Sequence, residues 1–116
     1  MKRNFIKLIK EVKDDNEVIY NTYLTPVFVP FRMMYEASDV QSELEKASGT
    51  KEEDPKKEMD MMLDMVVKIY DNQFTRDELI DGLHSPDAVR TLSEQIDWVA
   101  QGKMNDQAKK ELAKMI

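Results

Sequence analysis

Residues 70–83 (Tyr-Asp-Asn-Gln-Phe-Thr-Arg-Asp-Glu-Leu-Ile-Asp-Gly-Leu) constrain the fold of this chain more than any other segment. An apolar stretch ends at Tyr70, and one aromatic residue, Phe74, separates it from a new helix. Thr75 and Glu78 have the spacing of a capping box, in which each side chain accepts a hydrogen bond from a backbone amide at the helix start. The segment therefore predicts two helices joined by a short connection, with Phe74 as the anchor between them.

Capping residues and prolines place further helices on either side of this segment. Asp54-Pro55 and Ser85-Pro86 each combine a capping residue with a proline suited to the first helical turn, and Pro30 can also begin a helix. Apolar residues recur at spacings of three and four between these signals. We expect helices over residues 30–47, 55–72, 75–83 and 86–101, a charged link over 51–54, and a C-terminal helix or mobile tail over 103–116.

Residues 5–29 predict an antiparallel β-hairpin, because two runs rich in β-branched and aromatic residues flank a polar turn at residues 13–16. Pro26 and Pro30 limit the ladder, since proline lacks an amide donor. An isolated hairpin is marginal in water, so this one must pack on the helices or on another copy. The expected fold class is mainly α with an N-terminal β-hairpin, an α+β arrangement in one domain over residues 1–102.

Composition argues against several functional classes. The formal charge of −6 is unfavourable for a general nucleic-acid binder, which needs clustered Lys and Arg. The absence of cysteine excludes disulfides and thiolate chemistry, and one histidine leaves little room for histidine-based catalysis. We expect no signal peptide and no membrane span, because no window approaches about 18 consecutive apolar residues. A protein of a reducing, cytoplasmic compartment is expected.

No residue pattern indicates an enzyme, a cofactor or a metal site. Asp60 and Asp64 lie one helical turn apart and could hold a cation, but they lie opposite the apolar stripe and read as a solvated face. His84 reads as a loop residue. A helix-turn-helix layout over residues 75–101 carries two basic residues against six acidic ones, a balance that a DNA duplex would repel.

Methionines and one tryptophan are the candidates for partner contacts. The helix over 55–72 has an apolar arc of about half its circumference, so it is either central in the core or shared with a partner. Unbranched methionines adapt to variable surfaces, and a tryptophan off the main stripe is a common interface anchor. The predicted partner-binding residues are Met33, Met34, Met61, Met65, Ile69 and Trp98.

Residues 70–83 resemble the tail assembly chaperones of long-tailed phages (siphophages), especially those that infect Gram-positive hosts. In that family an apolar helix commonly ends in an aromatic residue, runs through Asn-Gln-Phe-Thr and enters a short acidic helix closing with Asp-Gly-Leu. The matching positions, which we expect to fix the fold, are Tyr70, Asn72, Gln73, Phe74, Thr75, Glu78, Asp81, Gly82 and Leu83. We expect Gly82 to form a close turn. A looser likeness spans most of residues 5–102.

The resemblance implies a protein without catalytic activity. Its expected partners are the tape measure protein, which it would keep soluble, and the tail tube protein, which it would help recruit; a homo-oligomer is left open. It would act in the host cytoplasm and be absent from the mature virion. Two alternatives remain: a structural tail or head–tail component retained in the virion, and a small acidic regulatory protein-binding module.

Overall fold

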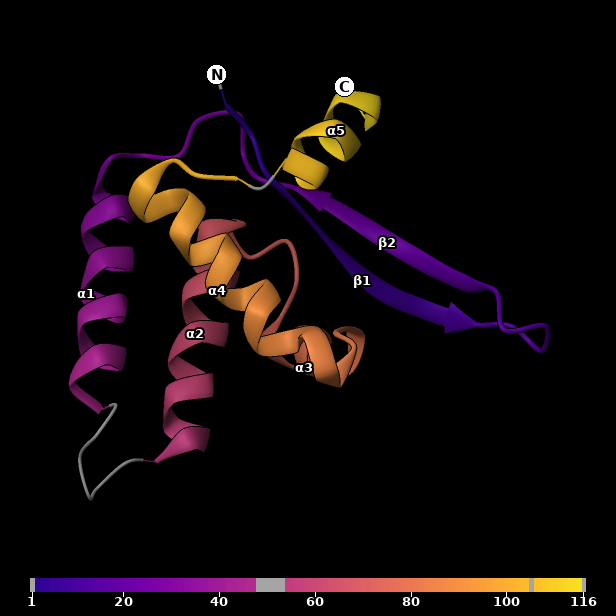
Figure 1. The fold of residues 1–116 in the computed structure, drawn as a ribbon, viewed down its shortest axis with the longest axis horizontal. Helices are drawn as coiled ribbons and strands as arrows, with labels where there is room; N and C mark the ends of the chain where they lie inside the picture. The colour runs from indigo at the N-terminus through magenta and orange to yellow at the C-terminus, as the bar shows by residue number, and fades with distance from the viewer. Residues whose placement is uncertain (1, 48–53, 105, 116) are drawn as a thin grey trace.

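The computed structural model describes residues 2–47, 54–104 and 106–115 of the chain. Within them, the elements are β1 (Phe5–Val12), β2 (Val18–Leu24), α1 (Arg32–Ala47), α2 (Pro55–Ile69), α3 (Arg76–Gly82), α4 (Ser85–Gln101) and α5 (Asp106–Met115). The two strands form an antiparallel hairpin, and the helices follow it (Figure 1). This arrangement confirms the predicted α+β fold class. The predicted link at residues 51–54 lies, except for Asp54, outside the described residues.

Helix α2 lies at the centre of the helical body. It packs against both α1 and α4, which also contact each other (Figure 1). Its buried residues are Met62, Leu63, Met65, Val66 and Ile69. The wide apolar arc of this helix is therefore explained by core neighbours on two sides.

The connection between α2 and α3 is built on Phe74. Its ring is buried and packs edge-on against Tyr23 of β2, with 5.0 Å between ring centroids, and against Tyr70, at 5.3 Å. Asp71 and Asn72 adopt left-handed backbone conformations (φ 53° and 60°), which turn the chain sharply after α2. The aromatic anchor thus joins the hairpin, the end of α2 and the start of α3.

Helix α3 begins with the predicted capping box. The Glu78 amide donates to the Thr75 hydroxyl at 3.1 Å, and the Thr75 amide donates to the Glu78 carboxylate at 3.0 Å. At the other end, Gly82 is buried against β1, where an added Cβ would lie 2.9 Å from the Cβ of Leu8. Gly82 therefore permits close packing of α3 on the hairpin. The prediction that Gly82 forms a close turn is wrong, because Gly82 is the last residue of α3 and its backbone is not left-handed.

The second strand ends at Leu24, five residues before the predicted limit of the hairpin. The register pairs Phe5 with Leu24 and continues outward to Val12 and Val18, with a bulge between Ile9 and Glu11. Beyond Leu24, only Thr25 continues the pairing, through its amide to the Asn4 carbonyl at 2.9 Å. Pro26 then removes the next amide donor, so residues 26–31 form an irregular connection to α1.

Several helix boundaries differ from the predictions by one to three residues, including both ends of α3. Helix α1 begins at Arg32, two residues after Pro30, and α2 ends at Ile69 with Tyr70 as its C-cap. Helix α4 begins at Ser85, so the residue before it is His84, whose side chain makes no capping hydrogen bond. Only Leu83 and His84 separate α3 from α4. Gly102 follows α4 in a left-handed conformation (φ 69°), so α4 ends at Gln101, the predicted last residue of this helix.

The C-terminal segment, left open between a helix and a tail, contains the helix α5, which has no buried residue. Among the described helices, none has both the length and the apolar composition that crossing a membrane requires.

Candidate partner-binding site

An apolar groove lies where the irregular connection after β2 meets α1 and α4. It is lined by Lys2, Val27, Phe28, Val29, Pro30, Phe31, Met34, Trp98 and Val99, and its volume is about 440 Å³. We call this surface the apolar groove. Most of its lining is hydrocarbon, and it lies open to solvent rather than inside the core.

Large apolar side chains stand exposed around this groove. Phe28 is 63% exposed, Phe31 66%, and Tyr35, one helical turn beyond Phe31, 65%. The rings of Phe31 and Tyr35 lie 5.4 Å apart in a tilted contact. Isolated exposed apolar residues are ordinary, but a contiguous group of aromatic residues is typical of protein–protein interaction sites.

Two of the predicted partner-binding residues line this groove. Met34 is 39% exposed on the first turns of α1, and Trp98 of α4 forms part of the groove wall. Trp98 is only 8% exposed, so it supports the groove more than it projects from it. The sequence placed Trp98 off the main stripe of its helix, and the structure places residues of the β2–α1 connection beside it.

The other predicted partner-binding residues lie elsewhere. Met65 and Ile69 are buried in the core, and Met33 is half-buried against it. Met61 is half-buried on α2. A partner could reach Met65 or Ile69 only if α2 separated from its neighbours, so contact by these two residues stays a prediction.

Residues of the 70–83 segment that sequence analysis assigned to the fold make specific contacts. The Gln73 side-chain amide donates to the Leu24 carbonyl at 2.7 Å. The amide of Asn72 donates to the Val67 carbonyl at 3.1 Å, and that of Leu83 to the Leu79 carbonyl at 3.1 Å. Asp81 is exposed. These contacts hold the end of the hairpin and the α2–α3 connection in place.

A buried polar cluster joins the hairpin to the helices. Gln95 of α4 donates from its side chain to the Phe5 carbonyl at 2.7 Å and accepts from the Tyr70 hydroxyl at 2.5 Å and from the Asn4 amide group at 3.1 Å. Burial raises the pKa of Tyr70 well above its ordinary value, and the hydrogen bond to Gln95 offsets part of that rise. Thr25, also buried, accepts from the Asn4 backbone amide at 3.0 Å.

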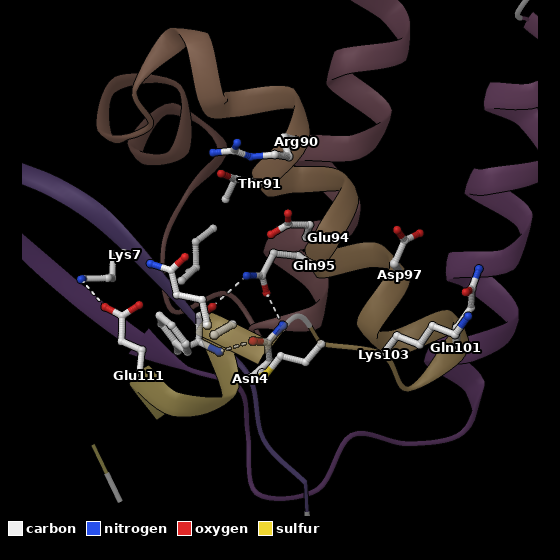
Figure 2. Close-up of a pocket in the computed structure, with 15 residues that line it drawn as sticks. Asn4, Lys7, Arg90, Thr91, Glu94, Gln95, Asp97, Gln101, Lys103 and Glu111 are labelled. Carbon is white, nitrogen blue, oxygen red and sulfur yellow. Dashed lines mark hydrogen bonds and ion pairs between the residues drawn. The ribbon is translucent and has the colours of Figure 1, made fainter. Parts of the chain in front are cut away.

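A second, more polar pocket of about 560 Å³ lies between β1, α4 and α5 (Figure 2). Asn4 and Gln95 lie at its floor, hydrogen-bonded to each other, and the Lys7 ammonium pairs with Glu111 of α5 at its rim. The two floor groups, Asn4 and Gln95, therefore satisfy each other's hydrogen-bonding capacity in part.

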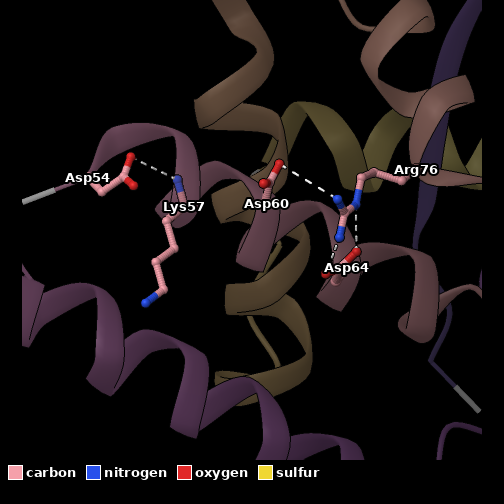
Figure 3. Close-up of polar contacts among 5 residues, drawn as sticks. All are labelled: Asp54, Lys57, Asp60, Asp64 and Arg76. Atoms are coloured by element: carbon pink, nitrogen blue, oxygen red, sulfur yellow. Dashed lines mark hydrogen bonds and ion pairs between the residues drawn. The ribbon is translucent and has the colours of Figure 1, made fainter.

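Arg76 pairs with Asp60 and Asp64, the two carboxylates that the sequence offered as a possible cation site. Its guanidinium donates to the two Asp64 oxygens at 2.8 and 2.6 Å and lies 3.9 Å from Asp60 (Figure 3). The Asp64 hydrogen bond is the main reason that the pKa of Arg76 is raised. In the described ranges, no group of three or more potential metal-ligating side chains is present. The protein's own arginine thus pairs with both carboxylates and balances one of their two negative charges.

Sequence reasoning missed two sets of residues. The predicted ranges place Val27 and Phe28 in the hairpin and Phe31 and Tyr35 in a helix, with no indication that these side chains lie at or beside the apolar groove. The sequence gives no signal for the buried contacts of Asn4 and Gln95. The apolar run Val27-Phe28-Val29-Pro30-Phe31 between prolines was the one available signal for the groove, because a strand that ends at Pro26 leaves such a run without a ladder.

A family model described as a phage tail chaperone protein matches the chain over residues 1–116. No curated protein and no solved structure matches the chain. The family match covers the apolar groove, the buried polar cluster and the 70–83 segment alike.

Proposed function

Since the chain belongs to the phage tail chaperone family, we propose that it binds the tape measure protein of its phage and keeps that helical rod soluble before the tail tube forms. Membership of this family assigns the chain a role in tail assembly, with protein partners. We propose that the tape measure protein binds at the apolar groove. The observation that supports this is the group of exposed aromatic residues at the groove.

The groove suits a helical client with an apolar face. Phe28 and Phe31 offer rigid aromatic surface, and Met34 offers an unbranched side chain that can repack against different client residues. An amphipathic helix laid in an apolar groove is a common mode of protein recognition. A groove of this size can grip only a short client segment, so the affinity of one copy is expected to be modest.

Many modest contacts along one rod are sufficient for solubility. If several copies bind successive segments of the same tape measure protein, each one covers apolar surface that would otherwise aggregate. Weak individual contacts also allow tube subunits to displace the chaperone as the tail grows. We propose that the protein has no catalytic activity, helps recruit the tail tube protein, acts in the host cytoplasm and is absent from the mature virion.

Co-expression with the tape measure protein from the same genome tests this function. We expect soluble tape measure protein that co-purifies with several copies of this chain. A tape measure protein that stays insoluble and unbound would refute the proposal. Mass spectrometry of purified virions provides a second test, because abundant copies in the particle would favour a structural tail component instead.

A further inference from the structure

The outer edges of the hairpin can be assigned from its hydrogen bonds. In an antiparallel pair, residues alternate between those that bond to the neighbouring strand and those whose backbone groups point outward. The Thr25 amide bonds to the Asn4 carbonyl, so this pair faces inward. With the observed register, the outward positions on β2 are Leu24, Thr22 and Tyr20.

Two glutamine side chains support this assignment. Gln73 donates to the Leu24 carbonyl and Gln95 donates to the Phe5 carbonyl, each at 2.7 Å. Phe5 and Leu24 face each other in the register. Both carbonyls therefore point outward, as the alternation requires, and each accepts a hydrogen bond from a glutamine side chain outside the hairpin.

Further along the hairpin, the edges of the two strands differ. The edge of β1 contains a bulge between Ile9 and Glu11 and carries charged residues, and α3 packs against this strand. On β2, no hydrogen bond among the described residues reaches the outward groups of Tyr20 and Thr22. This part of the hairpin projects beyond the helices (Figure 1). The open edge of the sheet is thus on β2.

The β2 edge lacks the usual protection against strand pairing. Proteins commonly place lysine, proline or a bulge on an exposed edge, and Val18–Leu24 (VIYNTYL) contains no charged residue and no proline. In the register above, the bulge lies opposite this strand, on β1. An uncharged edge with free amides and carbonyls is chemically suited to one kind of ligand, another extended strand.

The sequence of β2 is complementary to itself. If two β2 strands pair antiparallel about Asn21, Tyr20 meets Thr22 of the second copy, and their outward backbone groups face each other. The flanking pair on each side is Ile19 with Tyr23, and the pairing stops before Leu24, because the Gln73 side chain already donates to the Leu24 carbonyl. Pairs of aromatic and branched residues stabilise neighbouring strands, and no like charges meet in this arrangement.

We propose that the outer edge of β2 is a self-association surface, through which two copies of this chain pair antiparallel about Asn21. The product is a four-stranded sheet in the order β1–β2–β2–β1. The pairing of residues 19–23 buries less area than a standard protein interface of roughly 1,600 Å². We therefore expect a weak dimer whose population depends on protein concentration. This inference stands independently of the tape measure client.

Sedimentation analysis of the full chain over a concentration series tests the inference. Thr22→Pro removes an outward amide that the hairpin itself does not use, and we expect it to weaken dimerisation about tenfold or more. Thr22→Val keeps the amide and the branched shape, so it should dimerise like the wild type. Tyr20→Lys adds a charge to the edge and tests the same surface if Thr22→Pro reduces folding.

Crosslinking gives a geometric test, because the chain contains no cysteine. Asn21→Cys would bring its two Cα atoms to roughly 4.5 Å in the paired strands, within disulfide range. We expect it to form a covalent dimer under mild oxidation, much faster than Asp15→Cys in the exposed hairpin turn.

A wild type that stays monomeric throughout, or dimers that survive both Thr22→Pro and Tyr20→Lys, would overturn the inference. The inference would also be overturned if Thr22→Pro abolished the binding of a tail protein and left self-association unchanged.

Discussion

Gln73 and Gln95 hold opposite edges of the hairpin at the same register position. Gln73 follows α2 and donates to the Leu24 carbonyl, whereas Gln95 lies within α4 and donates to the Phe5 carbonyl, both at 2.7 Å. Phe5 and Leu24 are cross-strand partners. The base of the hairpin is thereby fixed to two separate helical segments, and this sets where the apolar connection after β2 begins.

Gln95→Leu should destabilise the protein strongly. The substitution keeps the approximate volume but leaves the Tyr70 hydroxyl, the Asn4 amide group and the Phe5 carbonyl without their buried partner. We expect a loss of about 2–4 kcal/mol in the free energy of unfolding, measured by urea denaturation. Gln101→Leu, the same change at an exposed position of α4, is the matched control. A loss below about 0.5 kcal/mol would contradict the structural role of Gln95.

Stability should fall at alkaline pH through Tyr70. Because burial raises the pKa of Tyr70 in the folded state, the folded protein holds this proton more tightly than the unfolded chain does. This contribution is complete below the unfolded value of about 10 and is lost as pH rises toward the folded pKa. Tyr70→Phe cannot ionise, so its unfolding free energy should fall less steeply above pH 10. Parallel slopes for the two proteins would contradict the prediction.

Gly82→Ala should destabilise although alanine favours helices. The added methyl group would lie 2.9 Å from the Leu8 Cβ, an atom close to the backbone that cannot move aside freely. We expect overpacking of about 1–3 kcal/mol to exceed the gain of about 1 kcal/mol in helix propensity. Thermal unfolding of Gly82→Ala beside Asp81→Ala, an exposed change in the same helix, checks this. Equal stability of both variants would argue against the tight contact.

Methionines on the surface and in the core should respond differently to charge. Met65→Glu places a carboxylate in the core, and we expect it to lose at least about 3 kcal/mol of stability. Met34→Glu lies at the apolar groove and should unfold like the wild type while binding the tape measure protein less tightly. Circular dichroism in urea measures the first effect and a pull-down the second. A stable Met65→Glu protein would show that α2 can expose this face.

Local chemistry made much of this fold predictable. The Thr75–Glu78 capping box and the Asp54 cap depend on residues within one turn of each other, so their spacing alone identifies them. Gly102 likewise ends α4 through its own left-handed backbone.

Features that depend on distant partners could not be predicted in this way. Periodicity marked Met65 and Ile69 as apolar, but it could not say whether a partner or the core covers them. Gln73 and Gln95 reach carbonyls 49 and 90 residues away, and nothing in their neighbours signals this. The groove depends on the strand ending at Leu24 and on Trp98 lying beside the following connection.

The most direct test of the account is the binding of the tape measure protein to Phe31→Glu, compared with Ile80→Glu. Both substitutions add a carboxylate at an exposed apolar side chain, but only Phe31 lines the apolar groove. We predict that both variants fold, that Ile80→Glu co-purifies with soluble tape measure protein as the wild type does, and that Phe31→Glu loses about tenfold or more in affinity. Equal binding by a folded Phe31→Glu variant would contradict the claim that the apolar groove holds the client.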